Sequence, residues 1–354
     1  MSLQRIGLDL STTLAVLAHA AALTASGWLC TQADQRQLFL ALQAILILLP
    51  DAFWQTLNLG GHFLGAACLL FLAVRNGRAL WACGIMTVLV GSASHLLKSW
   101  FEVPRPATLL QDRDLLHTIG ETLQANAMPS GHALSIAAVV GALCAMLAVE
   151  RCRVRAWIEA APGRQDRAAP ELQDKAAPGR QDKAAPGLQD KAAAGRKGNT
   201  AAGHKGSVAA GGAGKGIEQE GGDGEAFEDL RLLDRPWMLP VTGLIMLGVG
   251  LARVASGAHW PADVLVGTGL GLALGFVCGV LAVAIAERTG MTAQHARLVV
   301  RLEHLAAALL AFALLSVPLP PSISQAASLG LGMVLAADSL AALLTVRHDG
   351  ISRH

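Results

Sequence analysis

The chain has 354 residues, 53% of them hydrophobic, and its mean hydropathy is +0.45. This composition excludes an ordinary soluble domain and indicates a protein that crosses a membrane several times. The net charge of +2 gives no sign of nucleic-acid binding. The six cysteines show no C-x-x-C spacing, so we interpret them as small apolar side chains rather than disulfides or metal ligands.

Apolar stretches long enough to cross about 30 Å of hydrocarbon recur along the chain. The first, 10–30, contains Ala18-His19-Ala20; we expect a retained span, and a cleaved signal peptide is the alternative. Leu38–Pro50 is too short to span and ends in proline, so we expect an interfacial or re-entrant segment. The later candidates are 55–74, 79–97, 130–150, 237–254, 263–286, 302–318 and 324–346. The chain is therefore expected to be an all-α, polytopic membrane helix bundle.

The distribution of basic residues predicts the orientation of these spans. With the N-terminus in the cytoplasm, the outer connections are poor in basic residues apart from Arg36, Lys98, Arg105 and Arg113. The inner connections carry Arg75, Arg78, Arg151, Arg153, Arg155, Arg231, Arg235, Arg288, Arg297, Arg301, Arg347 and Arg353. By the positive-inside rule, both termini are expected inside.

Residues 151–236 differ in composition from the rest of the chain. From Ala161 an eight-residue unit of the type Ala-Pro-Gly-Arg-Gln-Asp-Lys-Ala recurs, and a glycine-rich run follows. Such a segment cannot bury enough apolar area to offset its chain entropy, so we expect disorder. We interpret it as a cytoplasmic linker, with a partner-binding segment as the alternative.

Three short polar groups stand at ends of the expected spans. Pro129-Ser130-Gly131-His132 opens the fourth span, where free backbone N–H groups and the helix dipole attract an anion. Lys98 and Arg105 follow the third span; both can grip phosphate oxygens, or can be ordinary boundary cations.

The third group is Arg253, followed by His259 and Asp263 at the start of the sixth span. A spacing of four residues lets a carboxylate orient a histidine for nucleophilic attack. A helix-capping aspartate beside an incidental histidine is the alternative. The orientation predicted above places all three groups on one outer face, where they could share one phosphate site.

These groups resemble the three signature motifs of the type 2 phosphatidic acid phosphatase family, over roughly residues 50–290. The resemblance implies that His259 is the nucleophile, Asp263 its partner and His132 the general acid. It also implies that Lys98, Arg105, Ser130, Gly131 and Arg253 bind the phosphoryl oxygens, with no metal and no cofactor. The chain departs from the family pattern in having Ala252 before Arg253, the long insert and the spans after residue 300.

We accordingly expect a six-helix phosphatase core with two extra C-terminal spans. The expected parts are 1–150 with spans one to four, the insert 151–236, spans five and six in 237–290, and a C-terminal hairpin in 291–354. The expected activity is hydrolysis of a lipid phosphate or diphosphate, such as undecaprenyl diphosphate or phosphatidic acid, at the outer face of a bacterial inner membrane. A lipid phosphotransferase, or a non-catalytic transporter or scaffold, is the alternative. The expected partners are a lipid substrate and the bilayer, and the sequence does not fix the oligomeric state.

Three further polar residues lie within the expected spans. We interpret His62 and His95 as packed histidines, with a role beside the site as the alternative for each. Asp338, inside the last span, is interpreted as a structural clasp with Arg301 or His304, because an unpaired carboxylate there is costly. A transport site is the alternative for Asp338.

Overall fold

The computed structural model describes residues 7–74, 77–110, 116–119, 126–160, 237–288, 293–316, 327–337 and 339–340. Every regular element in these ranges is a helix, which confirms the expected all-α fold. Residues 161–223 make up a separate unit, which contains the repeats and the glycine-rich run. They lie outside the described residues. Of the expected insert, only 151–160 is described.

Two long helices, α7 (Gly131–Ala160) and α10 (Pro261–Arg288), form the centre of the bundle. One face of α10 carries a glycine at every fourth position, and a methyl group there would strike the backbone of α7. Such small residues let two helix backbones touch. The methyl-to-oxygen distances would be 2.7 Å for Gly267 and Ser130, 2.4 Å for Gly271 and Leu134, 2.0 Å for Gly275 and Ala138, and 2.6 Å for Gly279 and Ala142.

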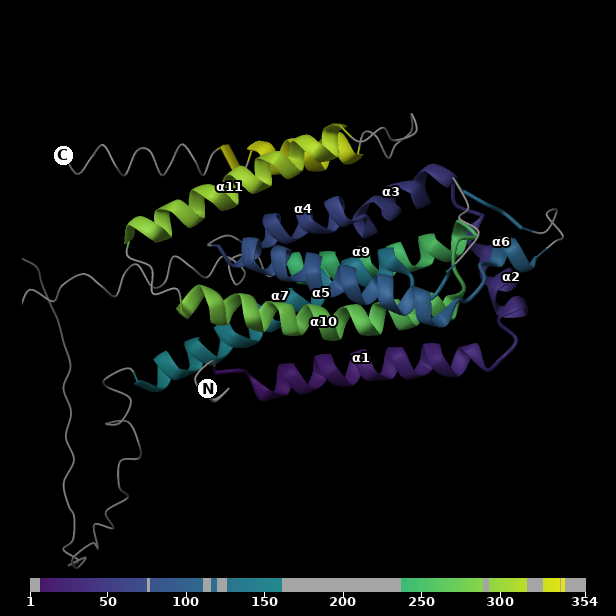
Figure 1. The fold of residues 1–354 in the computed structure, drawn as a ribbon, viewed down its shortest axis with the longest axis horizontal. Coiled ribbons are helices and arrows are strands. Elements are labelled where there is room, and N and C mark those ends of the chain that lie inside the picture. Colours follow the sequence, from purple (N-terminus) through teal and green to yellow (C-terminus); the bar gives the residue numbers. More distant parts are fainter. Residues whose placement is uncertain are drawn as a thin grey trace, which may run out of the picture. The chain divides into compact units, whose positions relative to one another are not determined.

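The other helices surround this pair (Figure 1). Helix α1 (Leu10–Thr31) and helix α5 (Arg78–Phe101) pack against α10, and α9 (Met238–Ala255) packs against α7. Helix α3 (Asp51–Gly61) lies on α9, and α4 (Phe63–Ala73) lies on α7. Most residues of the largest buried apolar cluster belong to α4, α5, α7 and α10.

Five helical segments among the described residues are long and apolar enough to cross a membrane: Leu10–Thr31, Arg78–Leu109, Gly131–Ala156, Met238–Ala255 and Pro261–Arg288. They correspond to the first, third, fourth, fifth and sixth expected spans. Within the described residues the chain is therefore a polytopic helix bundle.

The second expected span, 55–74, is wrong as a single helix. It is interrupted at His62, whose extended backbone (φ −64°, ψ 140°) ends α3, and whose Nδ1 accepts a hydrogen bond from Leu64 N at the start of α4. Upstream, α2 (Gln35–Leu46) meets α3 at an angle of 115°. Residues 38–50 are thus not a straight span, in line with the expected re-entrant or interfacial segment.

The C-terminal region is described in part. Helix α11 (Ala293–Ser316) contains most of the seventh expected span, and Ala327–Ala337 is a shorter apolar helix within the eighth. The carboxylate of Glu303 in α11 accepts a hydrogen bond from Gly77 N, just before α5. Asp338 lies outside the described residues, so its clasp stays a prediction.

Polar residues lie in two regions, one at each end of the helix bundle. At one end, Figure 1 shows α2 and α6 (Pro106–Leu109) close to the turn between α9 and α10. At the other end, Arg78 forms a buried ion pair with Glu150 at 2.9 Å, and Arg155 pairs with Asp9 at 3.0 Å. The Arg155 pair holds the last turns of α7, so residues 151–160 are helical and do not belong to the expected disordered insert.

Candidate active site

The first group of predicted residues lies at the C-terminal end of α5. Lys98 occupies the last turn of α5 and is half-buried. Arg105 directly precedes the short helix α6 and is only 4% exposed. Its Nη1 donates a hydrogen bond to the carbonyl oxygen of Ala258, 3.2 Å away in the turn between α9 and α10. The first and third groups are therefore in direct contact.

The second group opens α7, as the sequence predicts. Ser130 directly precedes the helix and is fully buried, and its backbone N–H donates to the Asp263 carbonyl oxygen at 3.0 Å. A methyl group on Gly131 would lie 3.5 Å from Lys98 Nζ, so the lysine reaches the first turn of α7. These two contacts join the second group to both others.

A tight turn sets the third group. The carbonyl oxygen of Arg253, in the last turn of α9, accepts hydrogen bonds from the backbone N–H groups of Ala258 (3.3 Å) and His259 (3.2 Å). Gly257 within the turn has φ +70°, a conformation that glycine adopts without strain. The turn is anchored by Trp260, whose Nε1 donates to Pro104 O at 2.9 Å.

His259 and Asp263 lie side by side at the start of α10, 2% and 1% exposed. His259 Nδ1 is 3.6 Å from Asp263 Oδ2, which is contact distance but longer than a hydrogen bond. The same Oδ2 accepts from Trp260 N at 2.9 Å, so Asp263 also caps the first turn of α10. The carboxylate therefore caps the helix and also faces the histidine, and its role as the partner of His259 stays a prediction.

The surroundings of His259 keep its ring neutral. Burial lowers the pKa of His259 well below its usual range, and the positive charges of Arg253, Arg105 and Lys98 lower it further. A neutral imidazole has a free lone pair for nucleophilic attack. The cations that can hold an anion therefore also keep the adjacent nitrogen available.

Several buried polar atoms here have no hydrogen-bond partner among the described residues. They are Ser130 Oγ, Arg253 Nε, His259 Nδ1 and Asp263 Oδ1. Buried polar atoms in proteins are nearly always paired, so a cluster of unpaired ones calls for a ligand. Three cations, a free hydroxyl and the exposed N–H groups at the start of α7 suit an anion with several oxygens.

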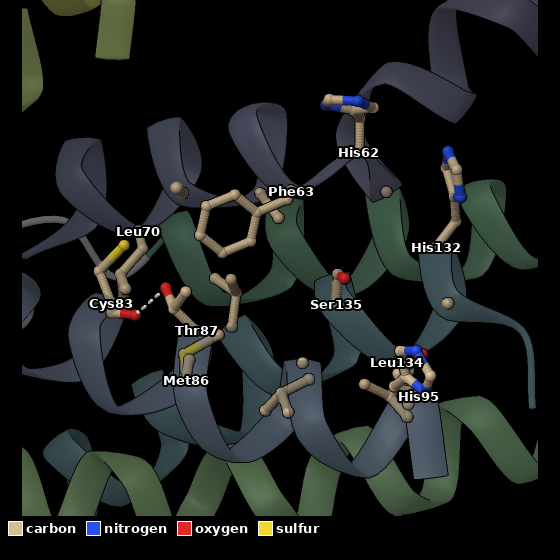
Figure 2. A pocket seen from close by; sticks show the side chains of 18 of the residues that line it. His62, Phe63, Leu70, Cys83, Met86, Thr87, His95, His132, Leu134 and Ser135 are labelled. Carbon is tan, nitrogen blue, oxygen red and sulfur yellow. Dashed lines mark hydrogen bonds between the residues drawn. The ribbon is translucent and has the colours of Figure 1, made fainter. Parts of the chain in front are cut away.

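An apolar groove begins at this site and runs between α4, α5 and α7 (Figure 2). Its volume is about 470 Å³, and Lys98, Gly131 and His132 form its polar end. His62 and His95 line it as well, and both are exposed. The interpretation of these two as packed histidines is therefore wrong. The rings of His62 and His132 lie 6.2 Å apart, centre to centre.

Comparison with known proteins agrees with this arrangement. The model of the PAP2 superfamily matches residues 79–178 and 190–286, which is more than half of the chain. No curated protein and no solved structure matches. The matched regions contain all eight predicted site residues, which the structure gathers at one end of the helix bundle. The chain belongs to the PAP2 superfamily, the family of phosphatases that its three motifs resemble.

Proposed function

We propose that this protein is a membrane phosphatase that hydrolyses a lipid phosphate or diphosphate monoester through a phosphohistidine intermediate. The observation that carries the proposal is the continuity of the apolar groove with the cationic site, since Lys98, Gly131 and His132 belong to both. A phosphate head group and a hydrocarbon tail need these two environments side by side. A water-soluble phosphate ester has no hydrocarbon tail that would bind in the groove.

In this proposal the cations hold the phosphoryl group. Arg105 and Arg253 offer planar forks for two oxygens each, and Lys98 adds a point charge. The hydroxyl of Ser130 and the first N–H groups of α7, beginning at Gly131, complete the cradle. These donors are in place before the reaction, so they stabilise charge as it spreads over the phosphoryl oxygens.

Two histidines act on opposite sides of the phosphorus. Nδ1 of His259 faces Asp263, so its Nε2 attacks, and the N–P bond forms as the P–O bond to the leaving group breaks. The negative charge of the bound phosphoryl group favours the protonated form of His132, which gives its proton to the departing oxygen. In the second step water attacks phosphorus and its proton passes to His132. The N–P bond then breaks, its electron pair returns to His259, and phosphate leaves.

The three cations supply the charge neutralisation that a metal ion provides in other phosphoryl-transfer enzymes. We therefore propose that the reaction needs no metal. The site is proposed to face the outer side of a bacterial inner membrane, in agreement with the distribution of arginines.

The test is phosphate release from lipid phosphates in mixed micelles with EDTA. Phosphatidic acid and an isoprenoid diphosphate are offered to wild type, His259→Ala and the control His19→Ala. His19 suits as the control because it lies exposed on α1, where its ring bonds Ala15 O. Release by wild type and His19→Ala, but not by His259→Ala, supports the proposal. A folded wild type that releases no phosphate contradicts it. Transfer of the phosphoryl group to an added lipid alcohol would identify a phosphotransferase instead.

A further inference from the structure

We propose that the groove between α4, α5 and α7 holds the substrate's hydrocarbon tail as a single extended chain, and that its far end at Leu70 and Cys83 limits the tail length. This inference rests on the proposed function, because the occupant is the tail of the same lipid whose phosphate binds at Lys98 and His132. It adds the residues that select among lipids.

The length of the groove can be estimated from the residues of α5 that line it. Groove residues recur on one face of α5, at Lys98, Gly91, Thr87 and Cys83 among others. Fifteen residues separate Lys98 from Cys83, which at 1.5 Å per residue is about 22 Å. With a volume of about 470 Å³ over that length, the groove is long and narrow, a shape that suits an extended alkyl chain.

The groove changes from polar to apolar along its length, as Figure 2 shows. His62, His132 and His95 lie near one end, and Leu70, Met86 and Cys83 lie near the other. The hydroxyl of Thr87 is satisfied within its own helix, since it donates to Cys83 O at 2.8 Å. The far half therefore offers a tail no unpaired hydroxyl, and a head group can bind only at the end that carries the cations.

One side of the groove is open. Leu70 and Leu134 on its floor are buried, whereas Phe63, Thr87 and Gly91 at its edge are exposed. Because α5 is one of the candidate spans and α4 is a shorter apolar helix beside it, we infer that this edge faces the hydrocarbon of a bilayer. A tail can therefore enter sideways from the membrane without passing through water.

Two neighbouring residues of α5 provide the test. Gly91 lines the groove and Ser92 does not; both are exposed, and a methyl group on Gly91 would meet no atom within 4 Å. A phenylalanine at Gly91 fills the groove seven residues from Lys98, which leaves about 10 Å of it beside the phosphate site. Successive residues of a helix point about 100° apart, so a phenylalanine at Ser92 places its ring outside the groove on the same helix.

The experiment measures kcat/KM of the full-length protein for hexyl and hexadecyl phosphate in identical micelles. We expect Gly91→Phe to lower the hexadecyl-to-hexyl ratio about ten- to a hundredfold, the factor expected when a group is forced into filled space. Ser92→Phe should keep the wild-type ratio. Cys83→Phe should penalise hexadecyl phosphate but not dodecyl phosphate, because it blocks only the far end.

An unchanged ratio in Gly91→Phe overturns the inference, as does an equal fall in Ser92→Phe. If Gly91→Phe does not give a monodisperse protein, Gly91→Leu takes its place with the same two outcomes. The inference and the proposed function fail in different ways. An active wild type with an unchanged ratio in Gly91→Phe overturns the inference alone, whereas a wild type that is inactive on every ester contradicts the proposed function.

Discussion

Gly267→Ala should damage the site although Gly267 carries no reactive group. The added methyl would lie 2.7 Å from the carbonyl oxygen of Ser130 and 3.2 Å from its nitrogen. Ordinary contact begins near 3.4 Å, so the oxygen must retreat by about 0.7 Å. That oxygen belongs to the backbone and cannot rotate away. The start of α7 has to move relative to α10, and with it Ser130 and His132.

The size of the effect follows from that displacement. A shift approaching 1 Å in a catalytic group costs up to about 10²-fold in rate, so we expect kcat/KM to fall roughly ten- to a hundredfold. Overpacking should also lower the free energy of unfolding by about 1–3 kcal/mol. Gly243→Ala on α9 is the control, because its methyl meets no atom within 4 Å.

The assay pairs phosphate release with thermal unfolding followed by tryptophan fluorescence. Gly267→Ala should lose activity at temperatures where it remains folded, whereas Gly243→Ala should keep its activity and have a Tm at or above the wild-type value. Wild-type kcat/KM in Gly267→Ala would refute the idea that the contact between α7 and α10 positions the two histidines.

Three other predictions concern the site itself. Asp263→Asn should lower kcat by roughly 10²- to 10⁴-fold with little change in Tm, because the amide can still cap α10 but cannot stabilise a charged His259; near-normal kcat would count against the pairing. Arg105→Lys should lower kcat/KM about tenfold or more because the planar fork is lost, and wild-type turnover would contradict that role. Since its pKa is lowered, His259 should stay neutral as pH falls through about 6.5, the ordinary histidine value. In ¹⁵N-histidine NMR spectra of the free protein, the signal lost in His259→Asn should therefore not titrate between pH 7.5 and 6, and a midpoint near 6.5 would exclude the cationic environment.

The residues of the candidate site could be selected from the sequence because its motifs are local in the chain. Two features can be recognised without the fold: Ser130 stands before an apolar run, and Asp263 follows His259 by four residues. The sequence does not show which partner each carboxylate oxygen of Asp263 contacts. Its Oδ2 is engaged by Trp260 N, a contact that depends on the backbone path into α10.

The interruption at His62 was missed because residues 55–74 are apolar on average, although Gln55, Thr56, Asn58 and His62 are polar. The signal was the glycine content: Gly60 and Gly61 precede the break, and a methyl on Gly65 would lie 2.0 Å from Leu59 O. A continuous helix has no need of such close approaches. The pairing of α7 with α10 was likewise encoded in glycines at every fourth position from Gly267.

The extent of α7 beyond residue 150 depended on distant partners. Arg153 pairs with Glu287 near the end of α10, and Arg155 pairs with Asp9 before α1. Composition alone assigned these arginines to the polar insert. Only the packed bundle shows that they face carboxylates.

The most direct test of the account is to trap the covalent intermediate. Wild type, His259→Asn and His19→Asn are mixed with lipid phosphate carrying ³²P in its terminal phosphoryl group, and the reaction is quenched in alkali within one turnover. The account predicts an alkali-stable, acid-labile label on the peptide that contains His259, in wild type and in His19→Asn but not in His259→Asn. Phosphate release with no labelled histidine, or a label that persists in His259→Asn, would contradict it.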